Sequence, residues 1–90
     1  MNQPRTNSPK ITMYVRPGCP DVARASYFLR ERGLTWDEID IDADAAAEAK
    51  VIAWTGRAVT PTLWIGDTML VEPGSAEIDA ALAENGETRR

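Results

Sequence analysis

One side chain in this sequence has an obvious capacity for covalent chemistry, the thiol of the single cysteine, Cys19. Pro17 and Gly18 precede it with a turn signal, and Pro20 follows it at the start of a helical pattern. Proline is favoured in the first turn of a helix, because the N–H groups there have no intrahelical partner. We therefore expect Cys19 at or just before a helix N-terminus, where unpaired N–H groups and the helix dipole favour an anion. A thiol in that position loses its proton more readily, and the thiolate is its reactive form.

Two charged residues beside Cys19 are expected to act on the thiolate in opposite directions. Arg16 adds a positive charge on the strand side of the turn. Asp21 suits a helix N-terminus but opposes thiolate formation because it is an anion. The alternative is that a lone cysteine is a small buried apolar residue without reactivity. Its position before Pro20, with Arg16 nearby, favours a reactive thiol with a pKa below the usual value of about 8.5.

Composition limits the other kinds of site. The chain has 90 residues, of which 43% are hydrophobic, so it is expected to form one small domain without disulfide bonds. The single cysteine and the absence of histidine exclude a cysteine-rich zinc site and Ser-His or Cys-His catalysis within the chain. We expect no metal site. The net charge of −4 argues against nucleic acid as the main partner.

Hydropathy predicts no contact with membranes. No apolar run approaches the roughly 20 residues of a membrane-spanning helix, and the N-terminus lacks the apolar core of a signal peptide. We therefore expect a cytoplasmic protein.

Periodicity predicts seven elements in the order β-α-β-α-β-β-α. Their expected ranges are strand 10–15, helix 20–32, strand 34–42, a second helix ending near 55, strands 62–65 and 68–71, and helix 75–85. Residues 1–9 are polar and are expected to form a flexible tail, so that the folded domain spans residues 10–86.

Helix ends and turns have their own sequence signals. Gly33 and Gly56 are natural helix stops, and Asp42 or Asp44 can cap the second helix. Ser75 is predicted to cap the last helix. The pair Gly66-Asp67 predicts a two-residue hairpin turn of a primed type.

This order of elements resembles the thioredoxin fold and, within it, the glutaredoxins. The resemblance covers roughly residues 10 to 85, and its motifs are Arg16-Pro17-Gly18-Cys19-Pro20, Gly56-Arg57 and Thr60-Pro61-Thr62. The segment Leu70-Val71-Glu72-Pro73-Gly74-Ser75-Ala76-Glu77 is similar to the actinobacterial mycoredoxins. The resemblance implies an α/β protein with a thioredoxin-like fold, in which helices flank a mixed sheet of four strands.

The resemblance also implies a role for each matching residue. Cys19 matches the nucleophile of the Cys-Pro-x-Cys motif, and Arg16 matches a basic residue that contacts the thiol cosubstrate. Arg57 falls where family members often carry a second polar or basic contact. Pro61 matches the cis-proline, and in the family the backbone of the residue in the position of Thr60 pairs with the bound thiol.

The sequence departs from the family pattern in two places. Val22 replaces the second cysteine and leaves a Cys-Pro-x-Val motif, so an external thiol must complete any exchange. Glutathione-binding members usually carry a Gly-Gly pair after the hairpin, where this chain has Val71-Glu72-Pro73. Proline removes an amide N–H and the glutamate adds a negative charge. We therefore expect glutathione to bind poorly and a thiol without carboxylates to bind better.

The sequence favours a monothiol glutaredoxin-like oxidoreductase that maintains cell redox homeostasis. It would reduce protein mixed disulfides through Cys19, with mycothiol or glutathione as cosubstrate, with no tightly bound cofactor, and as a monomer. The alternative is a non-catalytic thioredoxin-fold binding module that docks a peptide or thiol in the groove at Pro61. Monothiol relatives that bridge an iron–sulfur cluster typically carry Cys-Gly-Phe-Ser, which this chain lacks.

Overall fold

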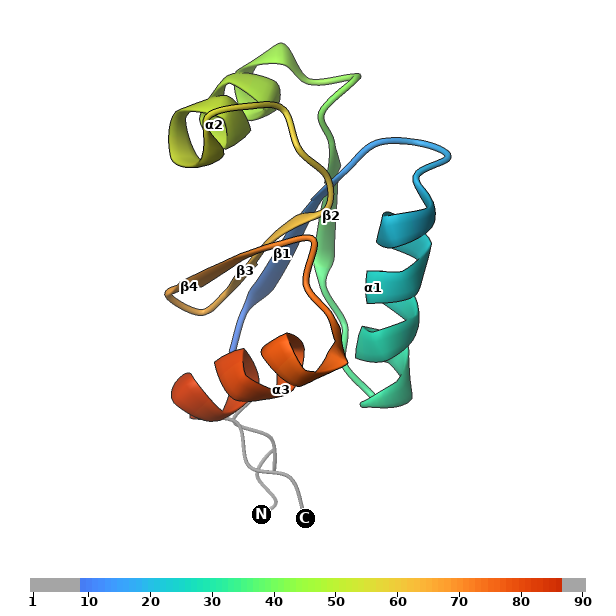
Figure 1. Cartoon of the computed structure of the whole chain (residues 1–90), viewed down its shortest axis with the longest axis vertical. Helices are drawn as coiled ribbons and strands as arrows, with labels where there is room; N and C mark the ends of the chain where they lie inside the picture. The colour runs from blue at the N-terminus through green and yellow to red at the C-terminus, as the bar shows by residue number, and fades with distance from the viewer. Residues whose placement is uncertain (1–8, 87–90) are drawn as a thin grey trace, which may run out of the picture.

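A mixed sheet of four strands forms the centre of the molecule in the computed structural model, which describes residues 9–86. The elements are β1 (Ile11–Val15), α1 (Pro20–Glu31), β2 (Asp37–Asp40), α2 (Ala45–Thr55), β3 (Thr62–Ile65), β4 (Thr68–Val71) and α3 (Ser75–Glu84). The strand order is β2-β1-β3-β4, and β1 runs parallel to β2 and antiparallel to β3. This is the thioredoxin-like architecture that the sequence predicts (Figure 1).

The helices cover both faces of the sheet. Alternate residues of a strand point to opposite faces, so Met13 and Tyr14 enter different hydrophobic cores. Met13 packs with Leu29 of α1 and Ile78 of α3, whereas Tyr14 packs with Val51 of α2. Figure 1 shows α2 on the side of the sheet away from α1 and α3. The central strand β1 is therefore packed on both faces. The turn that contains Cys19 begins directly after its carboxyl end.

Two of the predicted helix signals are confirmed in detail. The Asp44 carboxylate accepts a hydrogen bond from the Ala47 N–H at 3.0 Å and caps α2. Gly56 ends that helix in the left-handed conformation, with φ at 94°. Asp42, the other candidate cap, instead pairs with Arg16 at 2.7 Å.

Strand β2 is shorter than the predicted strand 34–42. It is an edge strand that pairs only with β1, and the last pair in the register is Val15 with Asp40. Because β1 leaves the sheet after Val15, β2 has no partner to continue the ladder beyond one further bond, from the Ile41 N–H to the Val15 carbonyl at 2.9 Å. Leu34 is buried in the core as part of a loop.

The prediction that Ser75 caps the last helix is wrong. Gly74 is the N-cap, and its N–H donates to the Glu77 carboxylate at 2.7 Å. Ser75 is the first helical residue, and its hydroxyl accepts a hydrogen bond from Arg32. The hairpin is confirmed, with Gly66 at φ 57° in its turn. The predicted tail lies outside the described residues except for Pro9.

Candidate active site

Cys19 occupies the N-cap position of α1, as the sequence predicts. Gly18 takes a positive φ of 78° in the turn that follows β1, and Pro20 is the first residue of the helix. The Cys19 carbonyl accepts bonds from the N–H groups of Val22 and Ala23 at 3.1 and 3.3 Å. The thiol is free and half-buried. The local sequence therefore places the sulfur at the first turn of α1, where N–H groups point outward.

Thr60 contacts the sulfur from the other side of the site. Its hydroxyl donates to Cys19 Sγ at 3.6 Å, and its carbonyl oxygen lies 3.8 Å from the same sulfur. The Thr60–Pro61 peptide bond is cis, as predicted, and both residues are buried. Sequence reasoning assigned a role to the Thr60 backbone but missed its hydroxyl. A hydroxyl residue just before the proline was the available signal.

The environment of Cys19 favours the thiolate. Burial raises the pKa of the Cys19 thiol. Hydrogen bonds from the Thr60 hydroxyl and from the N–H groups of Val22 and Asp21 lower this pKa, and together they outweigh the effect of burial. The Asp21 carboxylate raises it, as expected from its charge. The net result is a pKa below the usual value of a cysteine thiol, so the sulfur is activated by hydrogen bonds.

Arg16 is occupied by other partners, and this changes its expected effect on the sulfur. Its guanidinium donates to Asp42 at 2.7 Å and to the Ala58 carbonyl at 3.3 Å, and Glu48 lies 3.8 Å away. The pKa of Arg16 is raised mainly by the hydrogen bond to Asp42, and the Cys19 thiolate has the smallest influence. The groups that lower the pKa of Cys19 most are the Thr60 hydroxyl and two backbone N–H groups, so the charge of Arg16 is only a minor influence on the sulfur.

Arg57 belongs to the same loop as Thr60 and Pro61, between α2 and β3, but its side chain is exposed. The Thr55 hydroxyl and the Val59 N–H both donate to its carbonyl, at 2.6 and 2.9 Å, and fix its backbone. Within residues 9–86 its guanidinium makes no ion pair. Arg57 is thus a free cation on the loop that leads to Thr60.

A hollow of about 530 Å³ opens beside the sulfur, between the start of α1 and β2. We call it the Cys19 hollow. Its lining is Val15, Arg16, Pro17, Gly18, Cys19, Pro20, Val22, Ala23, Glu38 and Asp40. Sequence reasoning missed Glu38 and Asp40 as part of the site. Their spacing of two residues on one strand was the available signal, since it puts both on one face.

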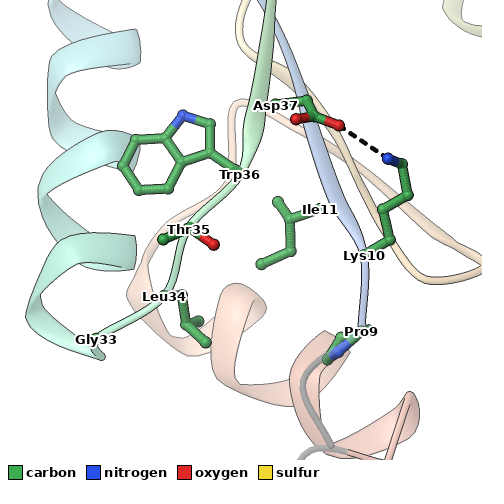
Figure 2. A pocket seen from close by; sticks show the side chains of 8 residues that line it. All are labelled: Pro9, Lys10, Ile11, Gly33, Leu34, Thr35, Trp36 and Asp37. Atoms are coloured by element: carbon green, nitrogen blue, oxygen red, sulfur yellow. Dashed lines mark hydrogen bonds and ion pairs between the residues drawn. The ribbon is translucent and has the colours of Figure 1, made fainter. Parts of the chain in front are cut away.

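A second hollow, of about 520 Å³, lies at the opposite end of β1. Figure 2 shows Lys10 and Asp37 at its rim, joined by an ion pair of 2.8 Å, with Leu34, Trp36 and Ile11 around it. None of its lining residues is a cysteine. The sulfur chemistry therefore belongs to the end of the sheet that carries the Cys19 hollow.

No group of three or more His, Cys, Asp or Glu side chains that could hold a metal ion occurs among the described residues. In the same part of the chain, no helix has the length and hydropathy needed to cross a membrane.

Comparison with known proteins agrees with this geometry. The glutaredoxin family model matches residues 11–70. A glutaredoxin from Pseudomonas aeruginosa is 30% identical over 67% of this chain and 71% of that protein. A hybrid peroxiredoxin from Haemophilus influenzae is 38% identical over 62% of this chain, which spans only 23% of that protein. The crystal structure of a glutaredoxin from Archaeoglobus fulgidus has a TM-score of 0.71 at 21% identity and covers 83% of this chain and 87% of its own.

Proposed function

Because the chain belongs to the glutaredoxin family, we propose that it is a thiol–disulfide oxidoreductase that works through a single cysteine. The observation that carries this proposal is the Thr60 hydroxyl, which donates to a sulfur at the N-terminus of α1. Together with the lowered pKa of Cys19, this contact supports a thiol that loses its proton more readily than an ordinary cysteine.

In the first step, the Cys19 thiolate attacks the small-thiol sulfur of a mixed disulfide between a protein and that thiol. The disulfide bond of the substrate breaks, and a new one forms between Cys19 and the small thiol. The protein sulfur leaves as a thiolate and takes a proton from water. The hydrogen bonds from Thr60 and from the helix N–H groups hold the attacking thiolate before the step.

The second step needs a second molecule of the small thiol, because Val22 stands where a dithiol enzyme has its resolving cysteine. The thiolate of this molecule attacks the small-thiol sulfur bound to Cys19, so that the Cys19 thiolate leaves and a disulfide of the small thiol is released. Over both steps, one molecule of the small thiol is consumed, the mixed disulfide is reduced to a protein thiol, and one disulfide of the small thiol is released. Arg16, Arg57 and the Thr60–Pro61 backbone are the groups that we propose hold the small thiol.

The end of the hairpin supports a cosubstrate without carboxylates, such as mycothiol, over glutathione. The Glu72 N–H donates to the Pro61 carbonyl at 2.9 Å, and Pro73 has no N–H to offer. Neither residue can therefore give a backbone amide to a carboxylate of glutathione. The exposed Glu72 side chain adds a like charge.

A turnover assay on mixed disulfides of glutathione and of mycothiol, run in parallel, tests the proposal. We expect turnover with at least one of them, faster with mycothiol, and none in Cys19→Ser. Alkylation of the native protein against pH gives a second test, with an expected midpoint below about 8.5. If the native thiol resists labelling and neither substrate turns over, the non-catalytic module that binds at Pro61 is the better explanation. A cytoplasmic location and a monomeric state remain predictions.

A further inference from the structure

Two carboxylates that line the Cys19 hollow, Glu38 and Asp40, indicate which protein substrates the site accepts. We propose that it receives a lysine or arginine side chain that lies next to the cysteine of a protein mixed disulfide. This inference rests on the proposed function and adds the chemical class of the polypeptide. Glu38 and Asp40 form the acidic wall, and both come from the edge strand β2.

Neither carboxylate of this wall has a cationic partner within residues 9–86. By contrast, two carboxylates near the Cys19 sulfur are paired, since Asp42 binds Arg16 and Asp21 binds Arg24. Glu38 accepts from the Trp36 indole N–H at 2.9 Å, and Asp40 accepts from the Asp42 backbone N–H at 2.8 Å. Both donors are neutral. They orient the carboxylates without cancelling their charge, which stays available to a cation from outside.

The rest of the hollow suits the stem of a long basic side chain. Val15, Pro17, Pro20 and Val22 supply apolar surface beside the acids. Lysine and arginine bury their methylene groups along such a surface and keep the charged end at a polar group. Arg16, the one cation of the lining, is already bound to Asp42 and close to Glu48.

The topology separates the acidic wall of this hollow from the Thr60–Pro61 part of the proposed thiol site. Strand β1 lies between β2, which carries the acidic wall, and β3, which follows Pro61. Thr60 therefore approaches the sulfur from the β3 side, whereas Glu38 and Asp40 line the hollow on the β2 side. A mixed disulfide has two different halves. With the small thiol on the Thr60 side, the hollow is left for the polypeptide.

The groove between α1 and β2 continues beyond the Cys19 hollow. Glu38 also lines a neighbouring hollow of about 390 Å³, together with Arg30, Leu34, Thr35 and Trp36. A polypeptide can follow such a path, whereas a small cation needs only the first hollow. Because Arg30 makes the far part of the path positive, the basic side chain is expected close to the cysteine of the substrate.

The test uses three peptides of sequence Gly-X-Cys-X-Gly with blocked ends, in which X is lysine, glutamine or glutamate. Each is supplied as its mixed disulfide with neutral 2-mercaptoethanol. The Cys19 thiolate breaks this bond, forms a disulfide with one half, and releases the other half as a thiol. The rate at which the Cys19 thiol is consumed is measured by mass spectrometry at low ionic strength. We expect the lysine peptide to react about fivefold faster than the glutamine peptide, and the glutamate peptide to react more slowly.

The variant Glu38→Gln/Asp40→Asn should reduce the lysine-to-glutamine rate ratio to roughly one. Because the glutamine peptide reports any change in thiol reactivity, the ratio isolates the effect of substrate charge. The control Asp67→Asn removes an acid from the hairpin turn at the other end of the sheet and should leave the ratio as in the wild type. Equal rates for all three peptides in the wild type, or a ratio unchanged by the double substitution, would overturn the inference and leave the proposed function intact. Failure of Cys19 to react with any peptide would overturn the proposed function itself.

Discussion

At the scale of single residues, Thr60 has a larger role than its position before a proline suggests. The hydroxyl reaches the sulfur because the fold brings together two segments that are 41 residues apart in sequence. Local sequence signals place Cys19 correctly, because a turn and a proline decide where a helix begins. The contact with Thr60 depends on the tertiary fold, so a hydroxyl residue before the proline marks a candidate but does not show that it reaches the sulfur.

Removing this hydroxyl should make the thiol less reactive. Thr60→Val keeps the shape of the side chain but takes away the donor, so the pKa of Cys19 should rise and alkylation at pH 7 should slow by about three- to tenfold. Thr60→Ser retains the hydroxyl and should react like the wild type. Iodoacetamide labelling against pH measures both variants. Equal slowing in the valine and serine variants would point to altered packing instead of a lost hydrogen bond.

Arg16→Ala should shift the alkylation midpoint less than Thr60→Val does. The Arg16 charge is compensated by Asp42 and Glu48, and its interaction with the Cys19 thiolate is weaker than the hydrogen bonds from Thr60 and the helix N–H groups. The same labelling experiment compares the two variants. A larger shift for Arg16→Ala would restore the direct charge effect that the sequence alone suggested.

The lowered pKa of Cys19 also predicts how stability depends on pH. An acid whose pKa is lower in the folded than in the unfolded protein stabilises the fold once pH exceeds the unfolded value of about 8.5. That stabilisation is lost as pH falls through the folded pKa. Urea unfolding of the wild type and Cys19→Ser at pH 6 and pH 9 should show the wild type gaining relative to the serine variant at the higher pH. A constant difference would mean that folding leaves the pKa of the thiol unchanged.

At the scale of elements, sequence periodicity predicts most of the structure, and the exceptions are the cap of α3 and the length of β2. The hairpin and the ends of α1 and α2 follow from local signals such as Gly66-Asp67 and Gly56. The length of β2 does not, because an edge strand extends only as far as its partner β1. The same register brings Asp40 opposite Val15 and so beside the Cys19 turn. A prediction from sequence alone therefore missed the acidic wall together with the true end of the strand.

The cap of α2 provides a test at this scale. Asp44→Ala removes the acceptor for the Ala47 N–H and should lower the free energy of unfolding by about 1 kcal/mol. Asp44→Ser can still accept this hydrogen bond and should lose much less. Chemical denaturation measures both. Because α2 packs on the face of the sheet opposite α1, the alkylation rate of Cys19 should remain unchanged in each variant.

Glu72, in the connection between β4 and α3, lies at an unusual φ of 49°. Glycine adopts this conformation without steric cost, although it gains more entropy in the unfolded chain. Glu72→Gly should therefore change the free energy of unfolding by no more than about 1 kcal/mol and should improve the use of glutathione by removing a like charge. Glu72→Gln, which removes the charge without freeing the backbone, should give the same improvement. Kinetics with glutathione mixed disulfides, together with urea titrations, separate the two effects, and improvement in the glycine variant alone would assign the benefit to the backbone.

At the scale of the whole molecule, charge is expected to control which thiols reach the sulfur. The chain carries a net charge of −4. Three carboxylates near the site, those of Glu38, Asp40 and Glu72, have no ion-pair partner among residues 9–86. Arg57 is a free cation on the loop that leads to Thr60, but the acids outnumber it. The electrostatic field of this excess negative charge repels an anionic thiol and attracts a cationic substrate before either makes contact.

The ionic-strength dependence of the reaction tests this field directly. Salt screens charges that are separated by more than a Debye length, which falls from about 30 Å at 0.01 M to about 8 Å at 0.15 M. Raising the salt concentration over this range should speed the reaction of Cys19 with glutathione disulfide, which is anionic, and slow its reaction with cystamine, which is cationic. Bis(2-hydroxyethyl) disulfide has no charge and should react at a constant rate, so it controls for changes in the thiol itself. Stopped-flow measurements give the reaction rate of each of the three disulfides at each salt concentration, and the slope of rate against salt concentration is compared among them. If all three slopes agree, substrate selection depends on contacts at the sulfur, and the preference for an uncharged cosubstrate must then come from the missing amides at Glu72 and Pro73.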